Sequence, residues 1–148
     1  MDPQPDFKEF LTLLNNHKVE YIIVGAYALA FHGVPRNTGD IDVFIHTTPS
    51  NAEQIVEALR DFGLSSLNLT VEDFLKPGQI VQLGHPPVRI DILTSISGVT
   101  WEQADKGKAP GKYGDVAVHY LGRQEYTVNK QALGRKKDLA DLEALNEK

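Results

Sequence analysis

The sequence contains no cysteine, which excludes disulfide bonds and zinc sites with thiolate ligands. Its longest stretch without Asp, Glu, Lys or Arg is the 15 residues from Tyr21 to Pro35, which include a histidine and two glycines. A helix that crosses a membrane needs about 20 apolar residues, so no membrane span is expected. The opening residues have neither the basic start nor the apolar run of a secretory signal, so we expect a cytoplasmic protein.

Basic residues are fewer than acidic ones: the sequence has 15 Lys and Arg and 20 Asp and Glu, which gives a net charge of −5. Such a chain lacks the broad positive field that draws proteins to nucleic acid without specificity. A polyanionic ligand must therefore meet a local basic patch. The 148 residues are 41% hydrophobic and 24% charged, which is typical of one globular domain, and we expect a single domain over residues 1–148.

Apolar spacing and turn residues predict helices that alternate with strands. Ser50 with Glu53, and Thr100 with Gln103, have the spacing of capping boxes that open helices. Gly63 follows the first of these helices as a stop signal. We expect helices over about 7–17, 26–31, 50–62, from 100 and from 124 onward (with Leu139, Leu142 and Leu145 as an apolar stripe), and strands over 21–24, 40–45, 79–83, 88–93 and 116–121.

This alternation predicts an α/β (α+β) fold in which helices flank a mixed sheet. Alternate residues of a strand point to the same face. Asp40 and Asp42 therefore share one face of their strand, and Arg89 and Asp91 share one face of theirs. If these two strands are neighbours, three carboxylates converge on one side of the sheet.

Three adjacent carboxylates repel one another unless a cation neutralises them. Oxygen ligands of this kind suit Mg²⁺ (or Mn²⁺), and a pair of such ions can clamp the attacking and leaving oxygens of a phosphoryl displacement. Asp40 and Asp42 would hold the metals, and Asp91 the metal that activates the incoming hydroxyl. Asp-x-Asp is also a common surface pattern at the start of a strand. Gly25 favours the functional interpretation, since a strand that runs through glycine into a helix offers backbone N–H groups to an anion.

These residues resemble the polymerase-β-type nucleotidyltransferase superfamily. Its pattern is an apolar strand, a Gly followed by Gly or Ser, a gap, and then Asp-apolar-Asp; here it is Val24-Gly25-Ala26, thirteen residues, and Asp40-Ile41-Asp42-Val43. Further segments are similar to the small bacterial and archaeal branch related to abortive-infection (AbiEii-like) and toxin nucleotidyltransferases. They are Ala28-Leu29, His32-Gly33, Arg36, Thr38 and Gly134 to Leu142. The resemblance spans about Glu20 to Leu145.

The resemblance implies transfer of a nucleoside monophosphate from a nucleoside triphosphate such as ATP to an acceptor hydroxyl, with release of pyrophosphate. Gly25 and the adjoining backbone would cradle the triphosphate, and Asp40, Asp42 and Asp91 match the metal ligands. Ala26 departs from the pattern, because many members carry Ser or Gly there. The loss of one hydrogen bond to a charged group costs about 1.5–3 kcal/mol, so nucleotide binding would weaken while the metal site remains.

Five residues outside the motif also bear on the site, and for the basic ones a functional role competes with a structural one. Arg36 reaches a phosphate or is a solvated loop residue, and Thr38 buttresses the same loop. Lys137 or Arg135, from the dense basic cluster of an acidic chain, contacts the triphosphate or acceptor, or belongs to a solvated helix face. Arg89 is expected to form a salt bridge that orients Asp91.

Three functions compete at this point. The first is an active nucleotidyltransferase whose acceptor is RNA, a protein hydroxyl or a small molecule. The second is a nucleotidyltransferase-like interaction protein that binds a partner protein, as an antitoxin does, with weak or no catalysis. The third is a magnesium-dependent phosphohydrolase, for which the sequence offers no obvious general base.

Overall fold

The computed structural model describes residues 3–36, 38–63, 67–85 and 88–148. Its strands form one mixed sheet in the order β3-β4-β2-β1-β6-β5. Neighbours β2 and β4, and β1 and β6, run parallel, whereas the other pairs are antiparallel. The strands are β1 (Tyr21–Val24), β2 (Asp40–Ile45), β3 (Ile80–His85), β4 (Val88–Leu93), β5 (Ala109–Tyr113) and β6 (Val116–Tyr120).

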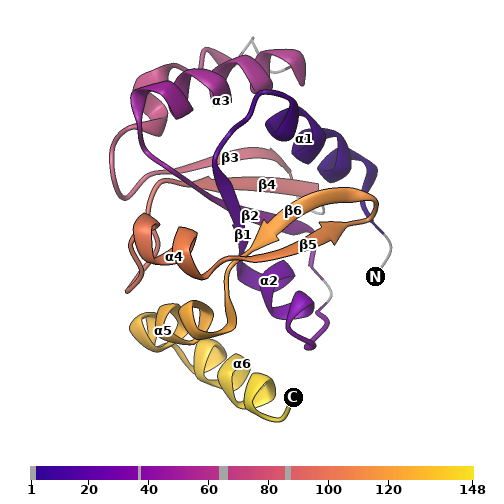
Figure 1. The fold of residues 1–148 in the computed structure, drawn as a ribbon, viewed down its shortest axis with the longest axis vertical. Coiled ribbons are helices and arrows are strands. Elements are labelled where there is room, and N and C mark those ends of the chain that lie inside the picture. Colours follow the sequence, from indigo (N-terminus) through magenta and orange to yellow (C-terminus); the bar gives the residue numbers. More distant parts are fainter. Residues whose placement is uncertain (1–2, 37, 64–66, 86–87) are drawn as a thin grey trace.

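Helices lie on both sides of this sheet, as the α/β prediction requires. Figure 1 shows α1 and α3 together on one side and the pair α5 and α6 on the opposite side. The helices are α1 (Pro5–Asn16), α2 (Gly25–Phe31), α3 (Pro49–Asp61), the 3-10 helix η2 (Val71–Phe74), α4 (Trp101–Gly107), α5 (Arg123–Leu133) and α6 (Lys136–Asn146). Within the described ranges, no helix is long and apolar enough to cross a membrane.

The core forms where the apolar faces of the helices meet the central strands. Helix α1 buries the four residues whose helical spacing the sequence shows, including Phe7 and Leu14. Strand β1 is buried along its whole length, with Ile22 and Ile23 at 0% exposure, because it lies between β2 and β6 in the middle of the sheet. The predicted strand over 21–24 is confirmed, and its unbroken apolar run is typical of a strand buried on both faces.

The start of α3 differs from the sequence prediction. The N-cap is Thr48, whose hydroxyl accepts a hydrogen bond from the Asn51 N–H at 3.2 Å, whereas Ser50 is exposed inside the first turn. Pro49 explains the shift, because proline is favoured at the first helical position, where no N–H is needed. The box formed by Thr100 and Gln103 is confirmed. Gly63 follows the last turn of α3 at φ +90°, as expected of a helix stop.

Two further differences concern the C-terminal half. Strand β5 was not predicted, because it contains Pro110 and Gly111, and proline is tolerated in a strand at the edge of a sheet. The helix expected from residue 124 is two helices, because Gly134 adopts the left-handed conformation at φ +65° and ends α5. Leu142 and Leu145 are buried, but Leu139 is exposed. The predicted strands over 79–83 and 88–93 pair in antiparallel fashion as β3 and β4, and residues 86–87 between them lie outside the described ranges.

The N-cap assignment gives a testable prediction. Thr48→Ala removes the hydrogen bond to the first turn of α3 and should lower the free energy of unfolding by about 1 kcal/mol. Ser50→Ala, two residues away in the same turn, should change it by less than about 0.5 kcal/mol. Urea denaturation of both variants measures the two values, and a larger loss for Ser50→Ala would contradict the assignment.

Candidate active site

The parallel pairing of β2 with β4 brings the three predicted carboxylates together. In this register Asp42 lies directly opposite Asp91, and Asp40 lies opposite Arg89. Neighbouring strands are about 4.8 Å apart, and residues directly opposite each other point to the same face. Asp40, Asp42, Asp91 and Arg89 therefore form one cluster, as the two-residue alternation in each strand predicted.

Arg89 binds two of the three carboxylates. Its Nε donates to Asp91 Oδ1 at 2.9 Å, and its Nη2 donates to Asp91 Oδ2 at 3.1 Å and to Asp40 Oδ2 at 3.0 Å. The side chain of Asp91 is only 10% exposed, whereas that of Asp40 is 36% exposed. The predicted salt bridge between Arg89 and Asp91 is confirmed, and the bond to Asp40 was not foreseen.

Asp42 has a raised pKa because it is largely buried and lies next to two other carboxylates. Burial, together with the negative charges of Asp91 and Asp40, raises the pKa of Asp42 from 3.8 to about 6, and Arg89 offsets part of this effect. A cation placed nearby would stabilise the ionised form of this carboxyl group and lower its pKa. The electrostatics therefore favour a positively charged ligand beside Asp42.

The residues fit a divalent cation in type and in register. Carboxylate oxygens are the ligands that Mg²⁺ prefers, and two neighbouring strands supply them to one face. As the side chains stand, no group of three or more His, Cys, Asp or Glu within the described part of the chain is placed to hold a metal ion. The Arg89 guanidinium contacts both oxygens of Asp91 and one oxygen of Asp40.

Gly25 leaves the space in which the Asp42 side chain lies. Its φ is +66°, a conformation that side chains rarely adopt, and a Cβ placed on it would collide with Asp42 Oδ2. The residue also begins α2, directly after β1. Both the left-handed backbone at Gly25 and the close approach of the Asp42 carboxylate therefore favour glycine at this position.

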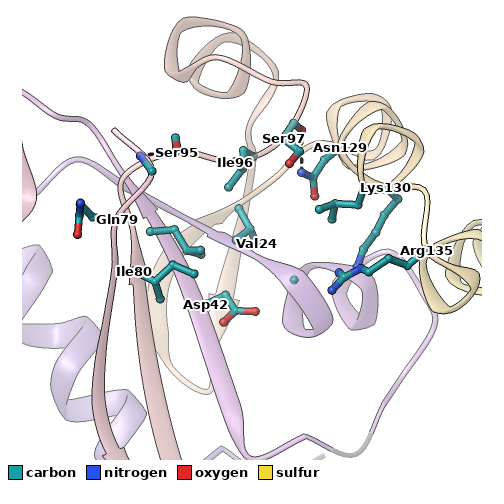
Figure 2. A pocket seen from close by; sticks show the side chains of 14 residues that line it. Val24, Asp42, Gln79, Ile80, Ser95, Ile96, Ser97, Asn129, Lys130 and Arg135 are labelled. Atoms are coloured by element: carbon teal, nitrogen blue, oxygen red, sulfur yellow. Dashed lines mark hydrogen bonds between the residues drawn. The ribbon is translucent and has the colours of Figure 1, made fainter. Parts of the chain in front are cut away.

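A cavity of about 590 Å³ opens beside Asp42 and Gly25. Figure 2 shows the Asp42 carboxylate at one side of it and the side chains of Lys130 and Arg135 across from it. The remaining wall comes from the start of β3, the segment after β4 and helix α5. Its lining residues are Val24, Gly25, Asp42, Gly78, Gln79, Ile80, Leu93, Ser95, Ile96, Ser97, Asn129, Lys130, Leu133 and Arg135.

The two basic residues of the cavity converge on one buried carboxylate. Asp138, which is 0% exposed, accepts from Arg135 Nε at 2.6 Å and lies 3.1 Å from Lys130 Nζ. These bonds, led by the one from Arg135, lower the pKa of Asp138 from 3.8 to about 2. Asp138 thus keeps its charge and holds two cations at the wall of the cavity.

Of the predicted carboxylates only Asp42 lines the cavity, and the predicted site residues outside the cluster do not line it either, apart from Gly25. Arg36 pairs with Asp141 of α6, and Ala26 is half-buried in α2. Thr38 bonds to the backbone N–H of Asp40 at 3.1 Å, so it supports the entry into β2 as expected of a buttress. Lys137 is exposed on α6. Arg135, named with Lys137 as an alternative, does line the cavity.

Asn129 and Lys130 were not singled out as site residues, although the wall of α5 depends on them. Asn129 is buried, and its Nδ2 donates to the Ser97 carbonyl at 2.8 Å, which joins α5 to the segment after β4 (Figure 2). A signal was available, because Asn129 lies three residues after the buried Tyr126 on the same helix face. A polar residue on the inner face of a helix indicates a specific partner.

Comparison with known proteins shows which type of fold the chain has. No protein-family model matches the sequence, and no curated protein matches it. Among solved structures, TM1012 of Thermotoga maritima, itself assigned only provisionally as a nucleotidyltransferase, is 19% identical with a TM-score of 0.63 over 100% of this chain and 97% of that one. The chain has a nucleotidyltransferase-type fold. The lincosamide antibiotic adenylyltransferase LnuA, bound to lincomycin, is 13% identical with a TM-score of 0.60 over 98% of this chain and 97% of that one.

Asp138 provides a prediction with a defined pH dependence. Asp138→Asn leaves Lys130 and Arg135 without their shared anion, so the free energy of unfolding at pH 7 should fall by about 3 kcal/mol. Because the folded-state pKa of Asp138 lies below the unfolded value, its contribution is complete above about pH 4 and is lost as the pH falls toward 2. Urea denaturation at pH 7, 4 and 3 should show the difference from wild type shrinking with pH.

Asp105→Asn is the matched control, because Asp105 forms an exposed pair with Lys108 on α4. It should cost less than about 0.5 kcal/mol at every pH. A deficit of Asp138→Asn that stays constant from pH 7 to pH 3 would contradict the role assigned to the buried carboxylate.

Proposed function

We propose that the chain is a metal-dependent nucleotidyltransferase that moves a nucleoside monophosphate from a nucleoside triphosphate to an acceptor hydroxyl. The observation that carries this proposal is the in-register cluster of Asp40, Asp42 and Asp91, in which Asp42 lies beside Gly25 at the wall of a 590 Å³ cavity. The likeness in fold to an adenylyltransferase supports it.

In this proposal Asp40, Asp42 and Asp91 hold Mg²⁺ or Mn²⁺. When bound, the metal would neutralise the phosphates and lower the pKa of the acceptor hydroxyl. The backbone at Gly25 approaches the triphosphate, and Lys130 and Arg135 attract it from the opposite wall. The acceptor oxygen forms a bond to the α-phosphorus as the bond to the pyrophosphate oxygen breaks. Pyrophosphate leaves with the electron pair, and the hydroxyl proton passes to water.

The donor and the acceptor are also part of the proposal. LnuA is described as an adenylyltransferase of lincosamide antibiotics, so ATP is the donor and a small hydroxylated molecule the acceptor to be tried first. Apolar Ile80, Ile96 and Leu133 beside Ser95 and Asn129 suit a small molecule with both kinds of surface. RNA and protein hydroxyls remain in the test as other acceptors, and the relation to the abortive-infection branch stays a prediction.

Transfer of label provides the direct test. The protein, Mg²⁺ and each nucleoside triphosphate labelled at the α-phosphate are incubated with a cell extract and, separately, with a panel of hydroxylated small molecules. Label should enter one acceptor fraction with wild type, and Asp42→Ala should reduce the rate by at least about 10³-fold, since it removes a ligand to the ion that stabilises the transition state. The fraction that carries the label identifies the acceptor class.

Asp105→Ala is the matched control, because it removes one exposed carboxylate from α4 and should leave the rate unchanged. Undiminished transfer by Asp42→Ala would refute the assignment of the site. Absence of label in every fraction, with all proteins folded, would favour the interaction protein, whose complex with a partner should survive Asp42→Ala. Release of free phosphate or nucleoside monophosphate without a labelled acceptor would indicate a phosphohydrolase.

Gly25 can be tested separately from the carboxylates. Gly25→Ala places a side chain on a left-handed backbone and displaces the Asp42 carboxylate. Gly63→Ala also places one on a left-handed backbone, at φ +90°, but its Cβ has no neighbouring atom within 4 Å. Both should lower the free energy of unfolding by about 1–2 kcal/mol. Only Gly25→Ala should also reduce transfer, by about 10²-fold or more, because a displaced ligand misplaces the reacting groups. Equal activity of the two variants would show that Gly25 is only a turn residue.

A further inference from the structure

The Arg89 guanidinium occupies the oxygen atoms that a metal ion would need. It donates to both oxygens of Asp91 and to Oδ2 of Asp40, at 2.9 to 3.1 Å. One guanidinium therefore bridges two strands, β2 and β4, through carboxylates of both. The third carboxylate, Asp42, forms no ion pair with it among the described salt bridges.

Two roles for such an arginine make opposite predictions. An arginine that orients Asp91 for the metal should raise metal affinity, as the outer hydrogen bonds of metal ligands do. An arginine that competes with the metal should lower it, because two cations would contact the same carboxylates and repel each other. The bond to Asp40 favours competition, since orienting Asp91 requires only the two bonds to Asp91 itself.

We propose that Arg89 is an internal counter-ion that competes with the divalent cation for Asp40 and Asp91, so that the metal binds only as the guanidinium leaves. This inference rests on the proposed function, because it takes the three carboxylates as metal ligands. The Arg89 side chain is 27% exposed, so it has access to solvent on leaving. Until the metal arrives with the oxygen ligands of the triphosphate, Arg89 neutralises the two carboxylates that the metal would contact.

Binding of Mn²⁺ in the absence of nucleotide tests the inference without any measurement of transfer. Titrations followed by electron paramagnetic resonance compare wild type with Arg89→Gln, Arg89→Lys and Arg60→Gln. Arg89→Gln should bind Mn²⁺ about tenfold more tightly than wild type, because one adjacent positive charge is gone. Arg89→Lys keeps the charge but loses the two-pronged bond, so its affinity should lie between the two.

The matched control is Arg60→Gln, which removes the same charge from an exposed pair on α3 and should bind Mn²⁺ as wild type does. The double variant Arg89→Gln, Asp91→Asn should lose the gain, because Asp91 is one of the two carboxylates for which Arg89 competes. Circular dichroism verifies that each variant is folded. If Arg89→Gln does not fold, Arg89→Lys still decides the question, since competition and orientation predict opposite signs for it.

The inference is overturned if either folded Arg89 variant binds Mn²⁺ no better than wild type, or if the gain persists in the double variant with Asp91→Asn. Failure of the proposed function has a different signature: Arg89→Gln binds Mn²⁺ more tightly, yet wild type transfers no label to any acceptor. Active transfer by wild type combined with weaker Mn²⁺ binding by Arg89→Gln would instead retain the enzyme and refute the competition.

Discussion

The parallel pairing of β2 with β4 is the constraint on which the candidate site depends. Its register sets Asp42 opposite Asp91 and Asp40 opposite Arg89. Because the side-chain period of a strand is two, a slip of one residue would turn Asp91 to the other face. Ile41, Val43, Ile90 and Ile92 are buried at 4% exposure or less, so such a slip would also expose apolar surface. The packing that stabilises the sheet therefore also aligns the carboxylates.

Two charge clusters of opposite design adjoin the cavity. In one, a single guanidinium pairs with Asp40 and Asp91, and burial together with the charges of these two neighbours raises the pKa of Asp42. In the other, two cations share the buried Asp138, whose pKa is lowered. The cavity lies between them, with Asp42 on one wall and Lys130 and Arg135 on another. A ligand that carries a cation and a polyanion together matches both walls, which is the form in which a metal–triphosphate complex would arrive.

The sequence was sufficient wherever a local period determined the structure. The carboxylates and the strand that ends at Gly25 follow from alternation and from one glycine, and Arg89 was placed on the correct face by the same rule. The predictions were wrong where two local signals competed. Ser50 and Thr48 both suit an N-cap, and only the position of Pro49 separates them. Strand β5 was missed because Pro110 and Gly111 argue against a strand unless it is known to lie at an edge.

The basic wall of the cavity, formed by Lys130 and Arg135, shows what local sequence patterns do not predict. The cluster from Lys130 to Lys137 was recognised, but Gly134 divides it between two helices, and the change of direction turns Lys137 to solvent while Lys130 and Arg135 face the cavity. Which cation of a cluster faces inward depends on the packing of α5 against α6, and that is a tertiary property. Gly134 itself was the available signal, since glycine after the last turn is a common helix stop.

A site of this kind requires only a few specific residues in the chain. In the proposed reaction the metal and the phosphates carry most of the chemistry, so the protein has to supply one close-packed glycine, three carboxylates in register and a pair of cations. The fold has to supply only the alternation of apolar residues that keeps β2 beside β4. Both sets of requirements are compatible with 13% to 19% identity over nearly the full length of chains that share the fold. The cavity wall formed by β3, α5 and the segment after β4 is not constrained in this way, so under the proposed function that wall would select the acceptor.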